Sequence, residues 1–184
     1  MEERNLTARG LQEYYIQKVV DIMSGLNSTS IVWQEVFDDG AKLPQDVIVH
    51  VWKGRHESEL SDVTSAGYQA ILSSCWYLDA LNSGGDWQKY YQCEPFDFDG
   101  SDDQKKLLVG GEACMWAEVV DENNLSTRVW PRASAAAERL WSSQSTVDVE
   151  SASRRLEEHV CRMNRRNIKA QPANGAGFCP DSNI

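Results

Sequence analysis

The stretch Val47-Ile48-Val49-His50-Val51-Trp52 decides the fold, because it is apolar at almost every position. A strand with one side in solvent alternates apolar and polar residues. A strand covered on both faces is apolar almost throughout, as in parallel sheets. The sequence therefore predicts a buried strand of a parallel sheet at 47–52.

Segments with helix and strand character alternate on both sides of this stretch. β-rich runs precede and follow it, and apolar residues at helical spacing occupy the segments between them. This order predicts an α/β fold with a parallel sheet, either doubly wound or barrel-like. We expect strands at 30–33, 47–52, 68–73 and 107–114, and helices at 11–23, 60–66, 86–92, directly after Ser101, at 131–141 and at 149–163.

Length and charge narrow the range of functions. The 184 residues suit one domain, and 18 basic against 28 acidic residues give a net charge of −10. A negative protein repels phosphate backbones, so we expect no nucleic-acid partner. No apolar run reaches the ~18 residues of a membrane span. The charged start, Met1 to Asn5, does not have the pattern of a secretory signal.

Aromatic residues stand at the ends of the expected strands, and acidic residues closely follow three of them. Ligands of parallel α/β folds bind beyond the carboxyl ends of the strands, so we expect these side chains to share one mouth. Sugar rings stack on indoles, and carboxylates accept hydrogen bonds from hydroxyls. The pattern favours a carbohydrate ligand; the alternative is that each Trp only fills the core. The aromatic residues are Trp33, Trp52, Trp76, Tyr77 and Trp116, and the acids are Glu35, Asp79 and Glu118.

Motifs for other chemistries are not found. No Gly-x-Gly-x-x-Gly follows the first expected strand, and there is no phosphate loop, which disfavours a nucleotide ligand. The histidines His50, His56 and His159 show no spacing typical of a metal site or a catalytic triad. We therefore predict no metal and no cofactor.

The cysteines and the glycosylation motifs leave the compartment open. The five cysteines lack the Cys-x-x-Cys spacing of a zinc site, but Cys75 and Cys93, like Cys161 and Cys179, are eighteen apart. A disulfide over such a loop stabilises by about 3 kcal/mol; five thiols in a cytosolic protein are the alternative. Candidate Asn-x-Ser/Thr glycosylation motifs, which matter only in the secretory pathway, start at Asn5, Asn27 and Asn124.

Several longer motifs carry a family resemblance. The stretch Val109-Gly-Gly-Glu-Ala-Cys-Met-Trp-Ala-Glu118 resembles the last barrel strand of the β-N-acetylhexosaminidases, glycoside hydrolase family 20. The resemblance spans about residues 10 to 180 and is to the eukaryotic lysosomal and secreted branch. The other matching motifs are Ile31-Val-Trp-Gln-Glu-Val-Phe37, Cys75-Trp-Tyr-Leu-Asp79, Asp86-Trp87, Asn124-Leu125, Val129-Trp-Pro-Arg-Ala-Ser134 and Ala137-Glu-Arg-Leu-Trp141.

The resemblance implies the second half of a (β/α)8 TIM barrel, strands five to eight, with a C-terminal helix. A complete barrel takes ~250 residues. Residues 1–184 would therefore form a partial family 20 catalytic domain, with irregular ends at 1–9 and 171–184. The family's catalytic Asp-Glu pair follows its fourth strand, and no motif of this sequence corresponds to it. By this resemblance the chain is a fragment.

The resemblance also implies a mechanism. Family 20 enzymes remove terminal non-reducing N-acetylhexosamine residues with retention, and the substrate's own acetamido oxygen attacks the anomeric carbon. Tyr77 would be the catalytic residue of this chain, donating a hydrogen bond to that oxygen. Trp33, Trp52 and Trp116 would enclose the acetamido methyl group.

Substrates, partners and location follow from the same resemblance. Asp79 and Glu118 would accept hydrogen bonds from outer sugar hydroxyls. The pair Asp79-Ala80 suggests neutral glycans that end in N-acetylglucosamine or N-acetylgalactosamine. The full-length enzyme would be a lysosomal or secreted homo- or heterodimer, with a C-terminal disulfide between Cys161 and Cys179.

Two alternatives to an enzyme remain. No motif of this sequence corresponds to the catalytic Asp-Glu pair. The first alternative is therefore an inactive carbohydrate-binding relic, and the second is a structural partner that completes the barrel of another chain. Half a barrel also leaves two sheet edges open, which predicts dimerisation or aggregation of the isolated chain.

Overall fold

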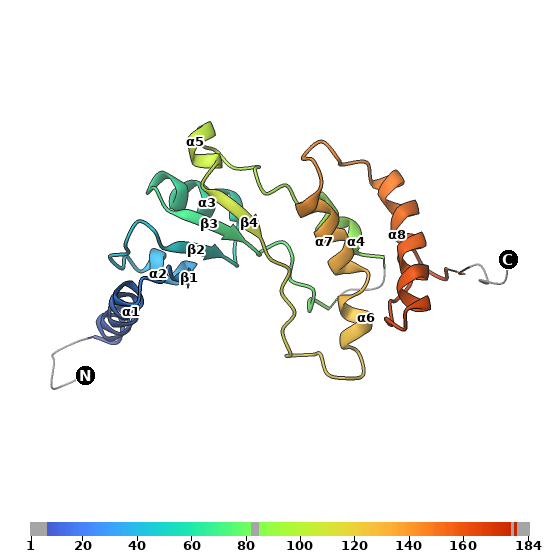
Figure 1. The fold of residues 1–184 in the computed structure, drawn as a ribbon, viewed down its shortest axis with the longest axis horizontal. Coiled ribbons are helices and arrows are strands. Elements are labelled where there is room, and N and C mark those ends of the chain that lie inside the picture. The colour runs from blue at the N-terminus through green and yellow to red at the C-terminus, as the bar shows by residue number, and fades with distance from the viewer. Residues whose placement is uncertain (1–6, 82–84, 178, 180–184) are drawn as a thin grey trace. The chain divides into compact units, whose positions relative to one another are not determined.

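The structure, a computed structural model, describes residues 7–81, 85–177 and 179. The chain divides into two compact units, Met1–Ser74 with Pro95–Gly111, and Cys75–Glu94 with Glu112–Ile184 (Figure 1). The first unit contains the sheet. The second is built on helices and includes one isolated parallel bridge between Tyr77 and Cys114.

The first unit contains a four-stranded sheet in the order β1-β2-β3-β4, with all strands parallel. The prediction of an α/β fold with a parallel sheet is confirmed. The strands are β1 (Ile31–Trp33), β2 (Ile48–Val51), β3 (Gln69–Leu72) and β4 (Leu108–Gly111), and the helices are α1 (Ala8–Gly25), α2 (Gln34–Asp38), α3 (His56–Ser65) and α5 (Asp102–Lys105).

One face of the sheet is covered by α3. Val49 of β2 lies in register with Ala70 of β3, and both side chains are fully buried. On α3, which packs against both strands, Leu60 and Val63 are fully buried as well. Gly67 follows the helix with a φ of +85°, the left-handed conformation that ends many helices and that glycine adopts readily.

The other face of the sheet is more exposed. Trp33 of β1 and His50 of β2 are register partners on this face. Ile31, two residues before Trp33, lies on the same side and is exposed. Since β1 and β4 are the outermost strands, each has one edge without a strand partner among the described residues.

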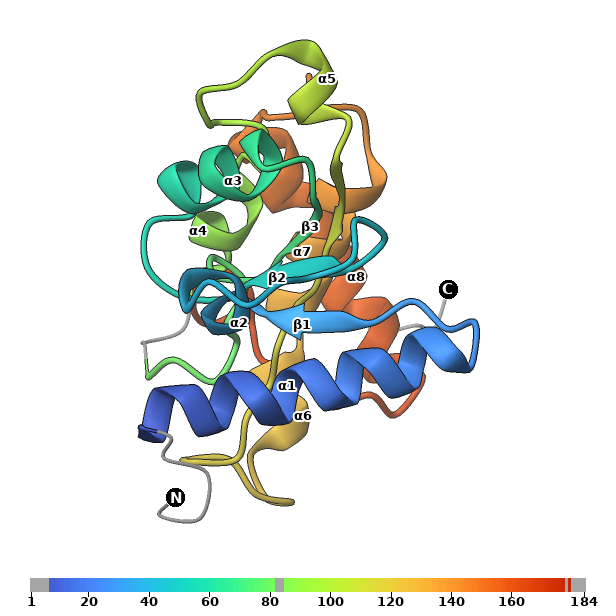
Figure 2. The ribbon, with the colours of Figure 1, turned by 90° about the vertical axis from the view of Figure 1, so that its left-hand side faces the viewer.

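Helix α1 runs alongside β1 (Figure 2). It starts at Ala8, inside the segment 1–9 that we expect to be irregular, because the Thr7 hydroxyl caps the first turn. The Arg9 guanidinium donates a hydrogen bond of 2.8 Å to the carbonyl of Asp39, just after α2. Val20 is the buried residue of this helix, so most of its apolar side chains remain exposed.

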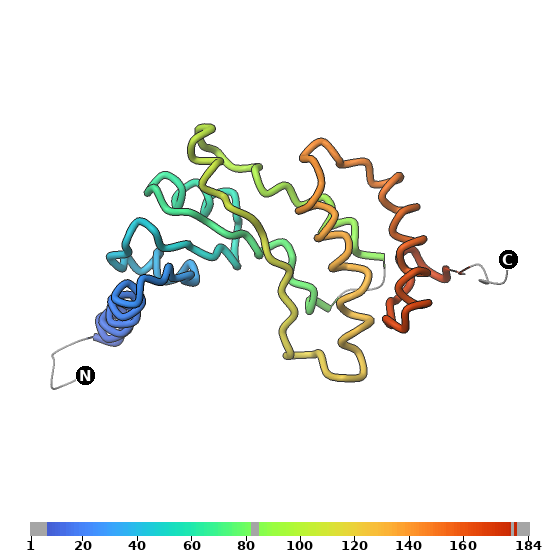
Figure 3. The backbone as a smooth tube through the Cα atoms, viewed as in Figure 1, coloured from blue at the N-terminus to red at the C-terminus, as the bar shows by residue number. Residues whose placement is uncertain are grey.

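The second unit consists mainly of helices (Figure 3). Their apolar side chains pack together in one core. Its helices are α4 (Trp87–Gln92), α6 (Leu125–Val129), α7 (Arg132–Trp141) and α8 (Val149–Arg165). The predicted apolar stripe of the last helix supplies half of the core, where it meets Trp87 and Tyr91 of α4. Among the described residues, none of the helices is long and apolar enough to cross a bilayer.

Two kinds of element differ from the prediction. Helices α2 and α6 are not expected from the sequence, because five residues are too few to show a helical period. The predicted strand 107–114 ends early, at Gly111, since consecutive glycines weaken a strand. Beyond it, only the bridge between Cys114 and Tyr77 continues the parallel pairing.

Candidate functional site

Two of the predicted site residues in the first unit form a corner of indoles. Trp33 ends β1 and Trp52 directly follows β2, so parallel pairing brings the two side chains to the same end of the sheet. Their ring centroids lie 5.9 Å apart, and their planes meet at 74°. Trp33 is 42% exposed, so the corner is open to a ligand.

His50 packs against the Trp33 indole of this corner. Its ring stacks on Trp33, with 4.6 Å between the centroids and 16° between the planes. The buried Nε2 lies 2.8 Å from the hydroxyl of Ser73, just after β3. The sequence shows no signal for this role, because the stacking follows from strand register.

Glu35 holds Trp52 in place. The indole Nε1–H of Trp52 donates to both carboxylate oxygens, at 2.8 and 3.0 Å. The Lys53 ammonium is 2.7 Å from the same carboxylate. Partial burial raises the pKa of Glu35, but the hydrogen bonds from Lys53 and Trp52 outweigh it and hold the pKa below the usual 4.5. Glu35 is therefore a support for an indole.

Gln34 ties the ends of β1 and β2 together. Its buried side-chain oxygen accepts hydrogen bonds from the backbone N–H groups of Trp52 and Lys53, at 3.0 and 3.1 Å. Because a buried amide needs partners, Gln34 fixes the backbone that carries the Trp52 ring. Sequence reasoning does not single out this residue.

The second unit holds Tyr77 and Asp79. The Leu78 N–H between them donates to the carbonyl of Cys114 at 2.8 Å, and the Cys114 N–H donates to the carbonyl of Trp76 at 2.9 Å. Cys114 is buried here. Oδ1 of Asp79 is also buried and has no hydrogen-bond partner among the described residues. This oxygen can accept a hydrogen bond from a ligand.

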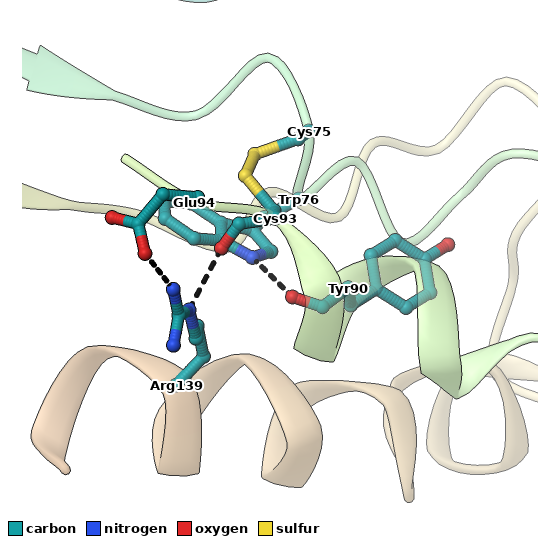
Figure 4. Close-up of a disulfide and its surroundings, with 6 residues drawn as sticks. All are labelled: Cys75, Trp76, Tyr90, Cys93, Glu94 and Arg139. Carbon is teal, nitrogen blue, oxygen red and sulfur yellow. Dashed lines mark hydrogen bonds and ion pairs between the residues drawn. A yellow bond between two sulfur atoms is a disulfide. The ribbon is translucent and has the colours of Figure 1, made fainter. Parts of the chain in front are cut away.

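A disulfide closes the loop that contains Tyr77 and Asp79, and Figure 4 shows this disulfide and its surroundings. Cys75 and Cys93, whose pairing the sequence leaves open, are joined. Trp76 is fully buried, and its indole N–H donates to the carbonyl of Tyr90 at 2.9 Å. The buried Arg139 of α7 donates to the carbonyl of Cys93 at 2.9 Å and forms an ion pair with Glu94. The sequence predicts that Trp76 is one of the aromatic residues at the strand ends that face a ligand, whereas the structure places it in the core.

The remaining predicted site residues of this unit lie after the bridge. Trp116 is 43% exposed and Glu118 is exposed. Of the predicted site residues, the structure brings the side chains of Trp33 and Trp52 into contact in the first unit, whereas Tyr77 and Asp79 are close only because they lie two residues apart in the chain. Neither unit of the described chain, taken by itself, gathers three His, Cys, Asp or Glu ligand atoms around one point.

The predicted modification sites differ in their surroundings. Cys161 and Cys179 form a disulfide, as the resemblance implies. Asn27 is exposed in the turn after α1. The Asn124 amide already donates to the carbonyl of Val119 at 3.0 Å. Asn5 lies outside the described residues.

Comparison with known proteins decides the family. The model of the glycosyl hydrolase family 20 catalytic domain matches residues 1–144. The chain belongs to family 20. The family resemblance of its motifs is therefore confirmed.

Relatives in the family include both subunit types of one enzyme. The chain is 54% identical to human β-hexosaminidase subunit β over 95% of its own length, and 46% identical to the mouse subunit α over 92%. It spans about a third of these family 20 relatives, 31% and 33% of their lengths.

Solved family 20 structures share the fold. A chitobiase from Flavobacterium johnsoniae matches with a TM-score of 0.77 and 29% identity, over 91% of this chain and 26% of the chitobiase. An exo-β-N-acetylglucosaminidase from Vibrio harveyi, solved with N-acetylglucosamine, matches with a TM-score of 0.79 over 94% of this chain and 29% of that chain. At 22% identity, the Vibrio match shows the fold alone.

Proposed function

We propose that this chain supplies the N-acetyl pocket of a β-N-acetylhexosaminidase. The observation that carries the proposal is the perpendicular pair of Trp33 and Trp52 at the carboxyl ends of β1 and β2. Two indoles at 74° offer two apolar walls to a methyl group, and a methyl group is the apolar end of the acetyl group that distinguishes an N-acetyl sugar from the free amine. Membership in family 20 supports the same assignment.

The reaction would be hydrolysis of a terminal non-reducing N-acetylhexosamine by the substrate-assisted retaining mechanism. The acetamido oxygen attacks the anomeric carbon, and Tyr77 holds that oxygen in position for the attack by donating a hydrogen bond from its phenolic hydroxyl. By the family resemblance, Trp116 would be the third indole around the acetamido methyl group. The general acid and the residue that orients the acetamide come from a segment upstream of this chain's motifs.

Two acidic residues would recognise the sugar hydroxyls. Oδ1 of Asp79 is buried and has no donor within the described part of the chain, which supports this role, because an acceptor without a donor is costly unless a ligand supplies one. The exposed Glu118 would accept a second hydroxyl. A hydrogen-bonding site of this kind suits neutral glycans that end in N-acetylglucosamine or N-acetylgalactosamine.

The barrel itself is part of the proposal. The chain would form strands five to eight of a (β/α)8 barrel, with α8 as the C-terminal helix. The exposed side of the sheet at Ile31 and Trp33 and the open edges of β1 and β4 support this, since closing a barrel covers both.

Assembly and location follow from the relatives. The two named relatives are subunits β and α of β-hexosaminidase, which supports a homo- or heterodimer for the complete enzyme. Two disulfides are typical of an oxidising compartment, in line with a lysosomal or secreted protein.

Sugar titration of the 184-residue chain tests the pocket. We expect N-acetylglucosamine, but not glucosamine, to shift the indole N–H signals of Trp33 and Trp52 in nuclear magnetic resonance spectra. Trp33→Ala and Trp52→Ala should each weaken binding about tenfold. Trp141→Ala is the matched control, because this side chain is 94% exposed and lies outside the pocket. An equal response to glucosamine would refute the acetamido pocket.

Measurement of substrate turnover distinguishes an enzyme from an inactive carbohydrate-binding protein. A chromogenic N-acetylglucosaminide should be cleaved by a longer polypeptide in which an Asp-Glu pair precedes this chain. If such a polypeptide binds the sugar without cleaving it, the chain is the carbohydrate-binding relic. If neither form binds sugar, the role of structural partner remains.

A further inference from the structure

Arg132 contacts the backbone between the two proposed sugar-binding residues of the second unit. Arg132 is the first residue of α7 and is only 1% exposed. Nη1 donates a hydrogen bond of 3.0 Å to the carbonyl of Leu78, which lies between Tyr77 and Asp79. The contact joins positions 54 residues apart in the sequence, so it depends on the fold of this unit.

The charge of Arg132 is balanced by Asp86. Nε of Arg132 is 2.8 Å from Oδ1 of Asp86, and the Lys89 ammonium is 3.3 Å from Oδ2. A buried guanidinium is costly unless it is paired and fully hydrogen-bonded. Because the guanidinium is planar and rigid, its ion pair with Asp86 also sets the direction in which Nη1 donates to Leu78. Asp86 therefore orients Arg132.

Neighbouring carbonyls of the same segment are held too. The carbonyl of Trp76 accepts from the Cys114 N–H at 2.9 Å, and the carbonyl of Tyr77 accepts from the hydroxyl of Tyr90 at 3.1 Å. With Arg132 on Leu78, three successive peptide carbonyls have a partner from another element. Because each peptide group is planar, fixing these groups fixes the directions in which the flanking side chains leave the backbone.

We propose that Arg132, oriented by Asp86, and Tyr90 are positioning residues that hold Tyr77 and Asp79 in the geometry for sugar binding. The inference rests on the proposed function, because it concerns the same pocket. Neither residue touches the sugar; both act through the backbone of 77–79. Small displacements of binding groups cost much affinity or rate, so loss of either contact weakens the site without unfolding the unit.

Amide hydrogen exchange tests the positioning in the 184-residue chain. Arg132→Lys and Tyr90→Phe should each accelerate exchange of the 77–80 amides at least about tenfold, while the amides of α8 remain unchanged. Tyr90→Phe removes one hydroxyl and keeps the ring, so it remains informative if Arg132→Lys does not fold. Arg154→Lys is the control, because Arg154 forms an exposed pair with Glu150 on α8.

Sugar titration of the same variants gives the second readout. We expect N-acetylglucosamine to bind the Arg132→Lys and Tyr90→Phe variants about tenfold more weakly than the wild type, and the Arg154→Lys variant equally well. Unchanged exchange at 77–80, or equal acceleration in α8, would overturn the positioning role whatever the sugar does. Faster local exchange with unchanged affinity would overturn its link to the pocket. Failure of the wild type to bind any sugar overturns the proposed function instead, and with it that link.

Discussion

The indole N–H of Trp52 points at the carboxylate of Glu35, with 2.8 and 3.0 Å to its two oxygens. Glu35 is the second residue of α2, which directly follows β1, whereas Trp52 follows β2, so the contact joins the ends of two neighbouring strands. The acid that follows the first strand-end aromatic therefore orients the second one.

Removal of the Glu35 carboxylate should loosen the indole corner. We expect Glu35→Leu to weaken N-acetylglucosamine binding by about 10- to 100-fold, which corresponds to the loss of one hydrogen bond to a charged group. Titration of the purified chain measures this. Asp103→Asn is the control, since Asp103 forms an exposed pair with Lys106 on α5, away from the corner. Equal loss in both variants would contradict the support role.

Protonation of Glu35 at low pH should weaken its hydrogen bonds with the Trp52 indole. Because the pKa of Glu35 is held below 4.5 in the folded chain, its stabilising effect is complete above pH 4.5 and is lost as the pH falls through the folded pKa. The indole signal of Trp52 should therefore move at acidic pH, below 4.5. In Glu35→Leu this movement should disappear; its persistence would assign the change to another group.

Glu59 should make the first unit less stable as the pH rises. Burial and the neighbouring Asp38 raise the pKa of Glu59 to about 7. The folded chain then holds a proton that the unfolded chain releases near 4.5, so the contribution of Glu59 to stability is greatest below 4.5 and falls as the pH rises towards 7. Thermal unfolding of Glu59→Gln should depend less on pH between about pH 5 and pH 8.

A neighbour on α3 provides the control for this variant. A backbone hydrogen bond lowers the pKa of Glu57, so its titration lies below the range of the experiment. Glu57→Gln should leave the pH dependence as it is in the wild type. A flat wild-type profile would show that Glu59 does not hold the proton.

The two disulfides should differ in function but not in loop entropy. Each closes a loop with a sequence separation of 18, so replacing either pair by alanine should cost about 3 kcal/mol of unfolding free energy. Only the Cys75–Cys93 pair encloses Tyr77 and Asp79, so only its loss should also weaken sugar binding. Equal binding losses in the two double variants would argue against this distinction.

Tyr77 should matter for turnover more than for folding. In a complete family 20 enzyme that contains this chain, Tyr77→Phe should lower kcat by about 10²-fold, because the acetamido oxygen loses the hydrogen bond that orients it for attack on the anomeric carbon. Thermal unfolding should change little, because the hydroxyl is lost and the ring kept. Unchanged turnover of an N-acetylglucosaminide would refute the catalytic role.

Local patterns were sufficient for most elements. The apolar run at 47–52 predicts β2, the stripe of α8 shows its core face, and Gly67 marks the end of α3. They fail for α2 and α6, whose five residues each carry no period. They also extend the last strand beyond Gly111, because a glycine pair does not show from sequence alone whether pairing continues.

The sequence by itself determined the order of the elements, the parallel sheet and the family, because these depend on local apolar spacing and on contiguous motifs. Only the tertiary structure decided what holds the site: His50 behind Trp33, Glu35 on Trp52, and Arg132 on the carbonyl of Leu78. These contacts join residues far apart in the chain, through strand register and helix packing. A buried arginine and a surface arginine look alike in a sequence, and burial becomes visible only when the packed neighbours are known.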